Sequence, residues 1–220
     1  MWRDTKIAKS QLELYLGSGV TIGKSAAKLS QDVRQCLKNP NSLFRRVRDR
    51  DGNLVLSKAA KKYHPGRGIY RSAYKNAMRL TRTENNMAYK ASDYLRRKQL
   101  PFVQGITVKL SNAHPQYDIC NPLAGDYPKG FNFMGWHSQC ICYTVSKLPT
   151  KEEFVNYIKT GQMDHRKFTR AIPTKAQNYL EKHKKQIQGW KNKPYWAENF
   201  TKDYKLKKSI IRESRETVNA

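Results

Sequence analysis

The sequence predicts an α+β protein with three parts: a helical N-terminal half with a β-hairpin, a small antiparallel β module with a Cys/His knuckle, and a helical C-terminal arm. Apolar residues recur at helical spacing on both sides of the middle of the chain, while two short segments in the middle alternate apolar and polar residues as half-buried strands do. Three of the four cysteines and two of the five histidines lie between His114 and Tyr143, a segment punctuated by Gly and Pro.

Charge divides the chain in the same way. The 220 residues carry 43 Lys/Arg and 17 Asp/Glu, a net charge of +26. The first hundred residues contribute +16, the next fifty +1 and the last seventy +9. We therefore expect a basic helical region over 1–100, a Cys/His β module over 101–148 and a basic helical C-terminal extension over 149–220. A long helix over 69–98 is expected to pack with the module as one domain.

So high a charge opposes compaction by self-repulsion unless a polyanion or an acidic surface is near. Nucleic acid is the expected polyanion, and an acidic protein surface is the alternative. No segment has the apolar run of a signal peptide or a membrane span. Reduced or metal-bound cysteines are therefore expected rather than disulfides, although a disulfide remains an alternative.

The N-terminal region is expected to begin with a helix over 5–16 and a turn at Gly17-Ser18-Gly19. Apolar residues from Ile22 onward recur at spacings of four, three, four and four and predict a second helix over 22–37. Asn39-Pro40 then stops the helix, because the residue before a proline disfavours the α conformation.

A β-hairpin is expected over 43–57, with its turn at Asp51-Gly52-Asn53. Four arginines lie on the first strand of this hairpin: Arg45, Arg46, Arg48 and Arg50. They are either a solvated strand face or contacts to nucleic-acid phosphates.

The long helix over 69–98 follows a turn over 63–68. Its apolar stripe comprises Ala73, Ala77, Leu80, Ala88, Ala91 and Leu95. Glu84 occupies a position in this stripe where an apolar residue is expected. An ionised carboxylate facing a core needs a partner, such as Arg82 or a cluster of backbone amides. A structural role as a buried salt bridge or cap is favoured over a catalytic carboxylate.

The middle module is expected to contain a strand over 103–110 and another over 140–147, which would place Cys140 and Cys142 on the same side. The residue types suit a tetrahedral zinc ion, because thiolates and imidazole are preferred zinc ligands. The candidate ligands are Cys120, His137, Cys140 and Cys142, with His114 as substitute. The alternatives are buried reduced cysteines, a disulfide, and a Cys/His nucleophilic pair without a local signature.

The C-terminal region is expected to be helical. Thr150 and Glu153 form a capping box for a helix that ends at Gly161, with Phe154 and Ile158 facing inward. Pro173 opens another helix, and the final thirty residues are expected to form an extended arm. Lysines in this region are candidate contacts to nucleic acid: Lys182, Lys184 and Lys185.

With these motifs in order, the chain resembles the Mu F-like minor head proteins, the head-morphogenesis family of tailed bacteriophages. The resemblance rests on Arg82-Thr83-Glu84 in the long helix, on Asp118-Ile119-Cys120, and on a closing His137, Cys140 and Cys142. The family pattern at the closure is His-Pro-x-Cys-Arg-Cys, from which this chain departs at Ser138 and Ile141. The match covers about residues 20–148 and leaves the C-terminal seventy unexplained.

The resemblance implies a non-enzymatic virion protein, at the portal vertex or the capsid interior, that passes through the host cytoplasm during assembly. Its implied partners are the portal protein or the inner capsid surface, with several copies around the portal, and packaged double-stranded DNA bound without sequence preference. No membrane partner is implied. The alternatives are a phage-delivered metal-dependent enzyme, nuclease or toxin-like, that uses Glu84, His137 and a metal, and a DNA-binding regulator with a zinc knuckle.

Overall fold

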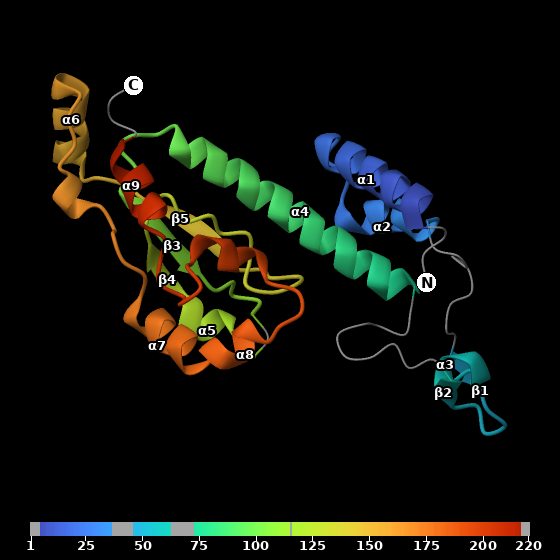
Figure 1. The fold of residues 1–220 in the computed structure, drawn as a ribbon. Helices are drawn as coiled ribbons and strands as arrows, with labels where there is room; N and C mark the ends of the chain where they lie inside the picture. The colour runs from blue at the N-terminus through green and yellow to red at the C-terminus, as the bar shows by residue number, and fades with distance from the viewer. Residues whose placement is uncertain (1–4, 37–45, 63–72, 115, 217–220) are drawn as a thin grey trace. The chain divides into compact units, whose positions relative to one another are not determined.

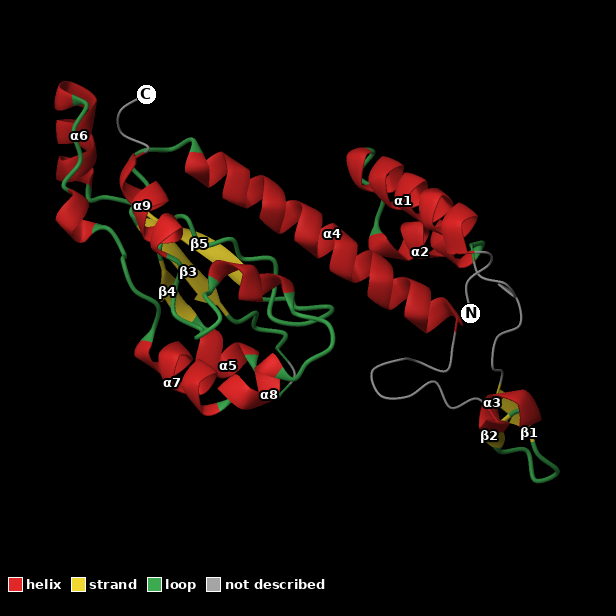
Figure 2. Ribbon diagram, viewed as in Figure 1, coloured by secondary structure: helices red, strands yellow, loops and turns green. Residues whose placement is uncertain are grey.

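The structure is a computed structural model that describes residues 5–36, 46–62, 73–114 and 116–216. It is a mixed α+β fold with two small antiparallel sheets, as predicted (Figures 1 and 2). The chain divides into two compact units, Met1–Asn85 and Asn86–Ala220. The boundary therefore falls within the long helix and not near residue 100, and the C-terminal seventy residues belong to the same unit as the Cys/His module.

Helices α1 (Thr5–Thr21), α2 (Ala26–Arg34) and the first half of α4 (Ala73–Lys98) supply the core of the first unit. Its apolar members are Leu12, Leu16, Leu29, Val33, Ala77 and Leu80. Thr81 Oγ1 donates to the carbonyl of Ala26 at 3.0 Å. The turn predicted near Gly17 does not form, because α1 continues to Thr21. Helix α2 begins only at Ala26, where Ser25 accepts a hydrogen bond from Lys28 N as N-cap.

The predicted hairpin is present as β1 (Arg46–Arg48) and β2 (Leu54–Leu56), which pair antiparallel. Gly52 has φ +80°, and Asp49 accepts hydrogen bonds from the backbone N–H groups of Asp51 and Asn53. These features close the turn as the Asp-Gly-Asn sequence predicts. A short helix, α3 (Lys58–Lys62), follows and was not predicted. The remainder of the first arm and the turn predicted over 63–68 lie outside the described residues.

The second unit is built on a three-stranded antiparallel sheet of order β4-β3-β5. Strand β3 (Gly105–Lys109) pairs with β4 (Gly125–Tyr127) and with β5 (Tyr143–Lys147). The strand predicted over 103–110 is thus confirmed, whereas β4 and the short helix α5 (Cys120–Leu123) were missed. Because β5 begins only at Tyr143, Cys140 and Cys142 lie in the loop before the strand and not on it.

The C-terminal segment packs into the core of this unit. It comprises α7 (Thr174–Lys182), α8 (Lys184–Gln188), the 3-10 helix η2 (Tyr195–Asn199) and α9 (Lys208–Glu216). Figure 1 shows α5, α7 and α8 gathered at one end of the sheet. The buried apolar residues of the segment are Ile172, Ala176, Leu180, Ile187, Trp196, Phe200 and Ile210. The expectation of an extended arm over the last thirty residues is therefore wrong, because aromatic residues there complete a core that the module cannot fill alone.

Helix α6 (Lys151–Thr160) has the predicted ends. Thr150 and Glu153 form the capping box, and Gly161 closes the helix at φ +69°. The helix nevertheless buries none of its side chains: Ile158 is 67% exposed and Phe154 is 37% exposed, its ring 5.1 Å from that of Phe102. The inward orientation predicted for these two residues is wrong. The spacing of apolar residues predicts which face of the helix is apolar, but it does not show whether another element packs against that face.

The second half of α4 turns a polar face to the module. Lys90 and Arg97 are 6% and 2% exposed, whereas Leu95, predicted to face inward, is 59% exposed. Arg97 forms an ion pair with Asp93 and donates to Thr144 Oγ1 at 3.0 Å. Thr144 in turn donates to Asp93 Oδ2 at 2.8 Å, so this network joins α4 to β5. The predicted packing of the long helix with the module is therefore present for its second half, through hydrogen bonds and not through the apolar stripe.

Candidate metal centre

Three cysteine side chains meet inside the second unit. Cys120 begins α5, while Cys140 and Cys142 precede β5, and all three are buried. Their sulfur atoms lie within 4.8 Å of one another, with 3.8 Å between Cys120 Sγ and Cys140 Sγ. The thiols are free, because a disulfide would require a separation of about 2.05 Å. A cluster of three buried sulfurs from two segments could hold a metal ion.

The loop that carries two of these cysteines needs unusual backbone conformations. Gly135 has φ +116° and Gln139, although not glycine, has φ +60°. A Cβ at position 135 would lie 3.1 Å from Cys140 Cβ and 3.3 Å from Lys90 Nζ. Cys140 N donates to the carbonyl of His137 at 3.2 Å, which folds the loop back on itself. Glycine at 135 therefore permits both the backbone turn and the close approach of a lysine to the cysteines.

His137 lies at the edge of the cluster, with Nε2 3.2 Å from Cys120 Sγ. Its Nδ1 is 2.7 Å from the carbonyl oxygen of Ser138. Because a carbonyl can only accept, Nδ1 carries the hydrogen, and in the neutral ring the lone pair of Nε2 points toward the cysteines. The same Nε2 is 3.2 Å from Asp118 Oδ2. The hydrogen of the Cys120 thiol, a second ring proton or a metal ion would each give this nitrogen a favourable partner.

Asp118 and His114 support this arrangement from outside the sulfur cluster. Asp118 Oδ1 accepts a hydrogen bond from Cys120 N at 2.7 Å and lies 3.1 Å from His114 Nε2. Partial burial raises the pKa of Asp118, but the hydrogen bonds from Cys120 and the charges of His137 and His114 outweigh it and hold the pKa below its ordinary value. His114, the predicted substitute ligand, thus contacts Asp118. It could also form a second ligand group with Asp118 and Cys120.

The thiols shift one another's pKa. Hydrogen bonds from Cys120 and Cys142 lower the pKa of Cys140, and the hydrogen bond to Cys140 is the main cause of the raised pKa of Cys120. The hydrogen bond to Cys120 lowers the pKa of Cys142, but the effects of Cys140 and of burial together outweigh it and raise that pKa to about 12.

Lys90 is the site residue that the sequence analysis missed. Its Nζ donates to the carbonyl of Cys140 at 3.0 Å, and Asn86 Nδ2 donates to the same oxygen at 3.4 Å. Burial lowers the pKa of Lys90, while the three cysteines oppose this shift. The available signal was the spacing of Asn86, Lys90, Asp93 and Arg97, which places four polar residues on one helix face.

Glu84 does not have the predicted partner. Burial raises its pKa, and no hydrogen bond or ion pair to its carboxylate is present among the described residues. Arg82 is exposed and does not pair with it. Glu84 belongs to the first unit and the cysteine cluster to the second.

The predicted nucleic-acid contacts lie partly within the described residues. Arg48, Arg50, Lys182 and Lys185 are exposed, and Arg48 donates to the carbonyl of Gly52. Lys184 instead forms an ion pair with Asp203 at 2.7 Å. Arg45 and the side chain of Arg46 lie outside the described residues.

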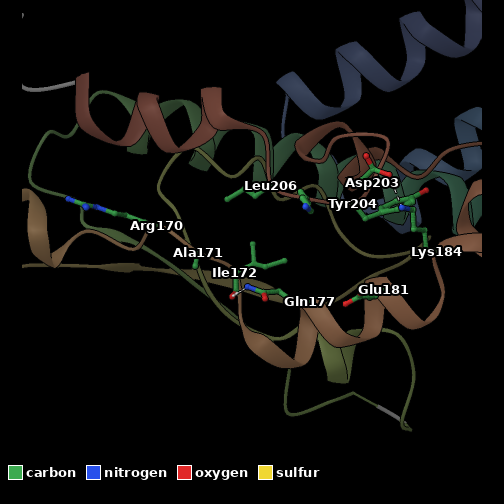
Figure 3. A pocket seen from close by; sticks show the side chains of 10 residues that line it. Arg170, Ala171, Ile172, Gln177, Glu181, Lys184, Asp203, Tyr204 and Leu206 are labelled. Carbon is green, nitrogen blue, oxygen red and sulfur yellow. Dashed lines mark hydrogen bonds and ion pairs between the residues drawn. The ribbon is translucent and has the colours of Figure 1, made fainter.

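An open cavity of about 580 Å³ lies between α7 and the segment that precedes α9 (Figure 3). Its lining combines the cations Arg170, Lys184 and Lys205 with the acids Glu181 and Asp203. Because charges of both signs are present and two of them pair with each other, no excess of one sign defines a ligand there.

No family model, curated protein or solved structure matches this chain. Among the described residues, no helix combines the length and apolar character needed to cross a lipid bilayer. The geometry of the site, the sequence motifs and the net charge are thus the basis for proposing a function.

Proposed function

We propose that the second unit holds one structural zinc ion, bound by Cys120, His137, Cys140 and Cys142. A zinc ion with bonds to sulfur of about 2.3 Å places its sulfur ligands about 3.8 Å apart at the corners of a tetrahedron. The 3.8 Å between the sulfur atoms of Cys120 and Cys140 supports this geometry and is the observation that carries the proposal. His137 has the expected second contact, because zinc-bound histidines usually donate their other ring N–H to a carbonyl or carboxylate.

A structural role follows from the number of these ligands and from the burial of the three cysteines, beside an exposed His137. Four protein ligands fill a tetrahedral shell and leave no position for a reactive water, whereas catalytic zinc keeps one position open. The ion would join α5 to the loop before β5. Because the unfolded chain has no preformed site, the free energy of zinc binding would stabilise this fold.

We propose further that the chain is a minor head protein of a tailed phage, acting at the portal or inside the capsid. Support comes from the resemblance at Arg82-Thr83-Glu84, Asp118-Ile119-Cys120 and the His137-to-Cys142 closure. Its cations, among them the exposed Lys182 and Lys185, would neutralise phosphates of packaged double-stranded DNA. The net charge of +26 supports a polyanionic partner.

The zinc centre is tested by metal analysis of the purified protein, with thermal melting in the presence and absence of a strong chelator. We expect one zinc per chain, a lower melting temperature with chelator, and loss of zinc from Cys140→Ser. Cys36→Ser is the matched control, because Cys36 is also buried and outside any disulfide but belongs to the first unit. Absence of zinc from the wild type, or equal zinc in both variants, would refute the centre.

The DNA contact is tested by measuring affinity for unrelated duplexes over a range of salt concentrations. Affinity should fall steeply with salt and hardly depend on sequence. The double variant Lys182→Gln/Lys185→Gln should lower the salt slope by about one per lost phosphate contact. Lys151→Gln/Lys159→Gln, which removes two exposed lysines of α6, is the control. Strong preference for one duplex would instead favour the regulator alternative.

A further inference from the structure

Lys90 is a buried cation without a carboxylate partner among the described residues. Its side chain is 6% exposed, its Nζ donates to the carbonyl of Cys140 at 3.0 Å, and it lies 4.9 Å from the centre of the Phe133 ring. A carbonyl and an aromatic face stabilise an ammonium only in part, because neither carries a net negative charge. Burial of an uncompensated charge is strongly destabilising, so an anionic partner would stabilise the charged form of Lys90.

The acidic groups that act on this ammonium are the thiols of Cys120, Cys140 and Cys142, and Cys140 Sγ and Lys90 Nζ both lie within 4 Å of the Cβ position of Gly135. Three thiolates, one neutral imidazole and one divalent cation carry a net charge of −1 together. One ammonium makes this set neutral. The absence of a side chain at Gly135, whose Cβ would lie 3.3 Å from Lys90 Nζ, leaves room for the ammonium beside Cys140.

We propose that Lys90 is the counter-ion of the metal centre, placed by α4 to neutralise the excess negative charge of three thiolates around one divalent cation. This inference rests on the proposed zinc centre. It makes the binding of the ion and the burial of the second half of α4 mutually dependent. Without the metal centre, the ammonium of Lys90 has no anionic partner, and without Lys90, the metal centre keeps an excess negative charge. It also gives the site a preference by charge: a divalent ion leaves the buried group neutral, whereas a monovalent ion such as Cu(I) leaves a net negative charge.

The first experiment measures zinc affinity by competition with a chromophoric chelator for the wild type, Lys90→Met and Lys109→Met. Methionine has similar length but no charge. Lys109 is an exposed lysine of β3 in the same unit and controls for the loss of one positive charge. We expect Lys90→Met to bind zinc about 10- to 100-fold more weakly, the usual effect of removing a group that supports the ligands. Lys109→Met should remain within about twofold of the wild type.

The second experiment separates a counter-ion from a packing residue by melting both proteins with and without zinc. Without zinc, Lys90→Met should melt at or above the temperature of the wild type, because it no longer buries an uncompensated charge. With zinc, it should melt lower. A packing residue would instead lower both melting temperatures equally.

Each result has one meaning. A wild type that binds no zinc overturns the proposed centre itself. A wild type that binds zinc, together with unchanged affinity in Lys90→Met, overturns only the counter-ion. The counter-ion proposal is also overturned if metal-free Lys90→Met fails to fold under conditions where the metal-free wild type folds. In the metal-free protein the ammonium has no anionic partner, so its removal should not prevent folding.

Discussion

The replacement Trp196→Ala is the most direct test of how the C-terminal segment is folded. Trp196 is fully buried, and its ring centre lies 6.0 Å from those of both Trp136 and Phe200. Its Nε1 donates to the carbonyl of Trp136 at 3.1 Å. Removing a buried tryptophan costs roughly 3–5 kcal/mol. A domain has a free energy of unfolding of only about 5–15 kcal/mol, so the loss should be large and easily measured.

The assay is denaturant unfolding followed by far-ultraviolet circular dichroism at saturating zinc, because the variant removes a fluorophore. Trp196→Phe keeps most of the ring and loses the hydrogen bond, so it should cost about 1–3 kcal/mol. Tyr195→Ala is the control: Tyr195 is the preceding residue and 57% exposed, so its loss should cost less than about 1 kcal/mol. If Trp196→Ala and Tyr195→Ala lower the free energy of unfolding by the same amount, the C-terminal segment is an extended arm and the core described above is wrong.

Three further predictions concern glycine, lysine and glutamate. Gly135→Ala should cost about 1–3 kcal/mol and weaken zinc binding, since alanine is strained at φ +116° and its Cβ would meet Cys140. Gly17→Ala, in α1 with open space around it, should stabilise instead, and equal effects on melting would contradict the argument. Burial, aided by Lys98, lowers the pKa of Lys129 to about 8, so between about pH 8 and pH 10 the unfolded chain binds a proton there that the folded chain does not. The free energy of unfolding should therefore rise with pH across that window in the wild type more than in Lys129→Met, as measured by denaturant unfolding of both at each pH. Burial raises the pKa of Glu84, so the stability its protonated form contributes is present at low pH and lost as pH rises through the folded pKa. Glu84→Gln should therefore be at least as stable as the wild type at pH 7, with a smaller difference near pH 4; a clear loss of stability at pH 7 would reveal a partner outside the described residues.

Local signals in the sequence predicted the elements that depend on neighbouring residues. The capping box of Thr150 and Glu153, the αL end at Gly161 and the hairpin turn at Gly52 are all present. Each depends on hydrogen bonds or backbone angles within a few residues, so no distant contact can override it easily. The same reasoning failed for the turn near Gly17, because glycine permits a turn without requiring one.

The clustering of the cysteines was also predictable. Cys120, Cys140 and Cys142 meet as expected, and His137 contacts one of them, with Nε2 3.2 Å from Cys120 Sγ. The local backbone of Cys140 and Cys142 was predicted wrongly, because a loop and not a strand carries them, and the helix α5 that carries Cys120 was not predicted. Residue type indicates which side chains share a site, whereas the path of the chain between them depends on the core it encloses.

Residue pattern alone was enough to predict the α+β class, the capped helices, the uneven charge and the residues of the cysteine cluster. Three features became visible only in the folded chain: the C-terminal segment completes the core through Trp196, α4 buries Lys90 and Arg97 in place of Leu95, and Glu84 has no described partner. The physical reason is that burial of a charge is decided by its partners, and these partners are distant in sequence: Cys140 is fifty residues from Lys90, and Thr144 is 47 from Arg97. Periodicity identifies an apolar face, but a buried lysine that donates to a distant carbonyl has the same sequence pattern as a lysine in water.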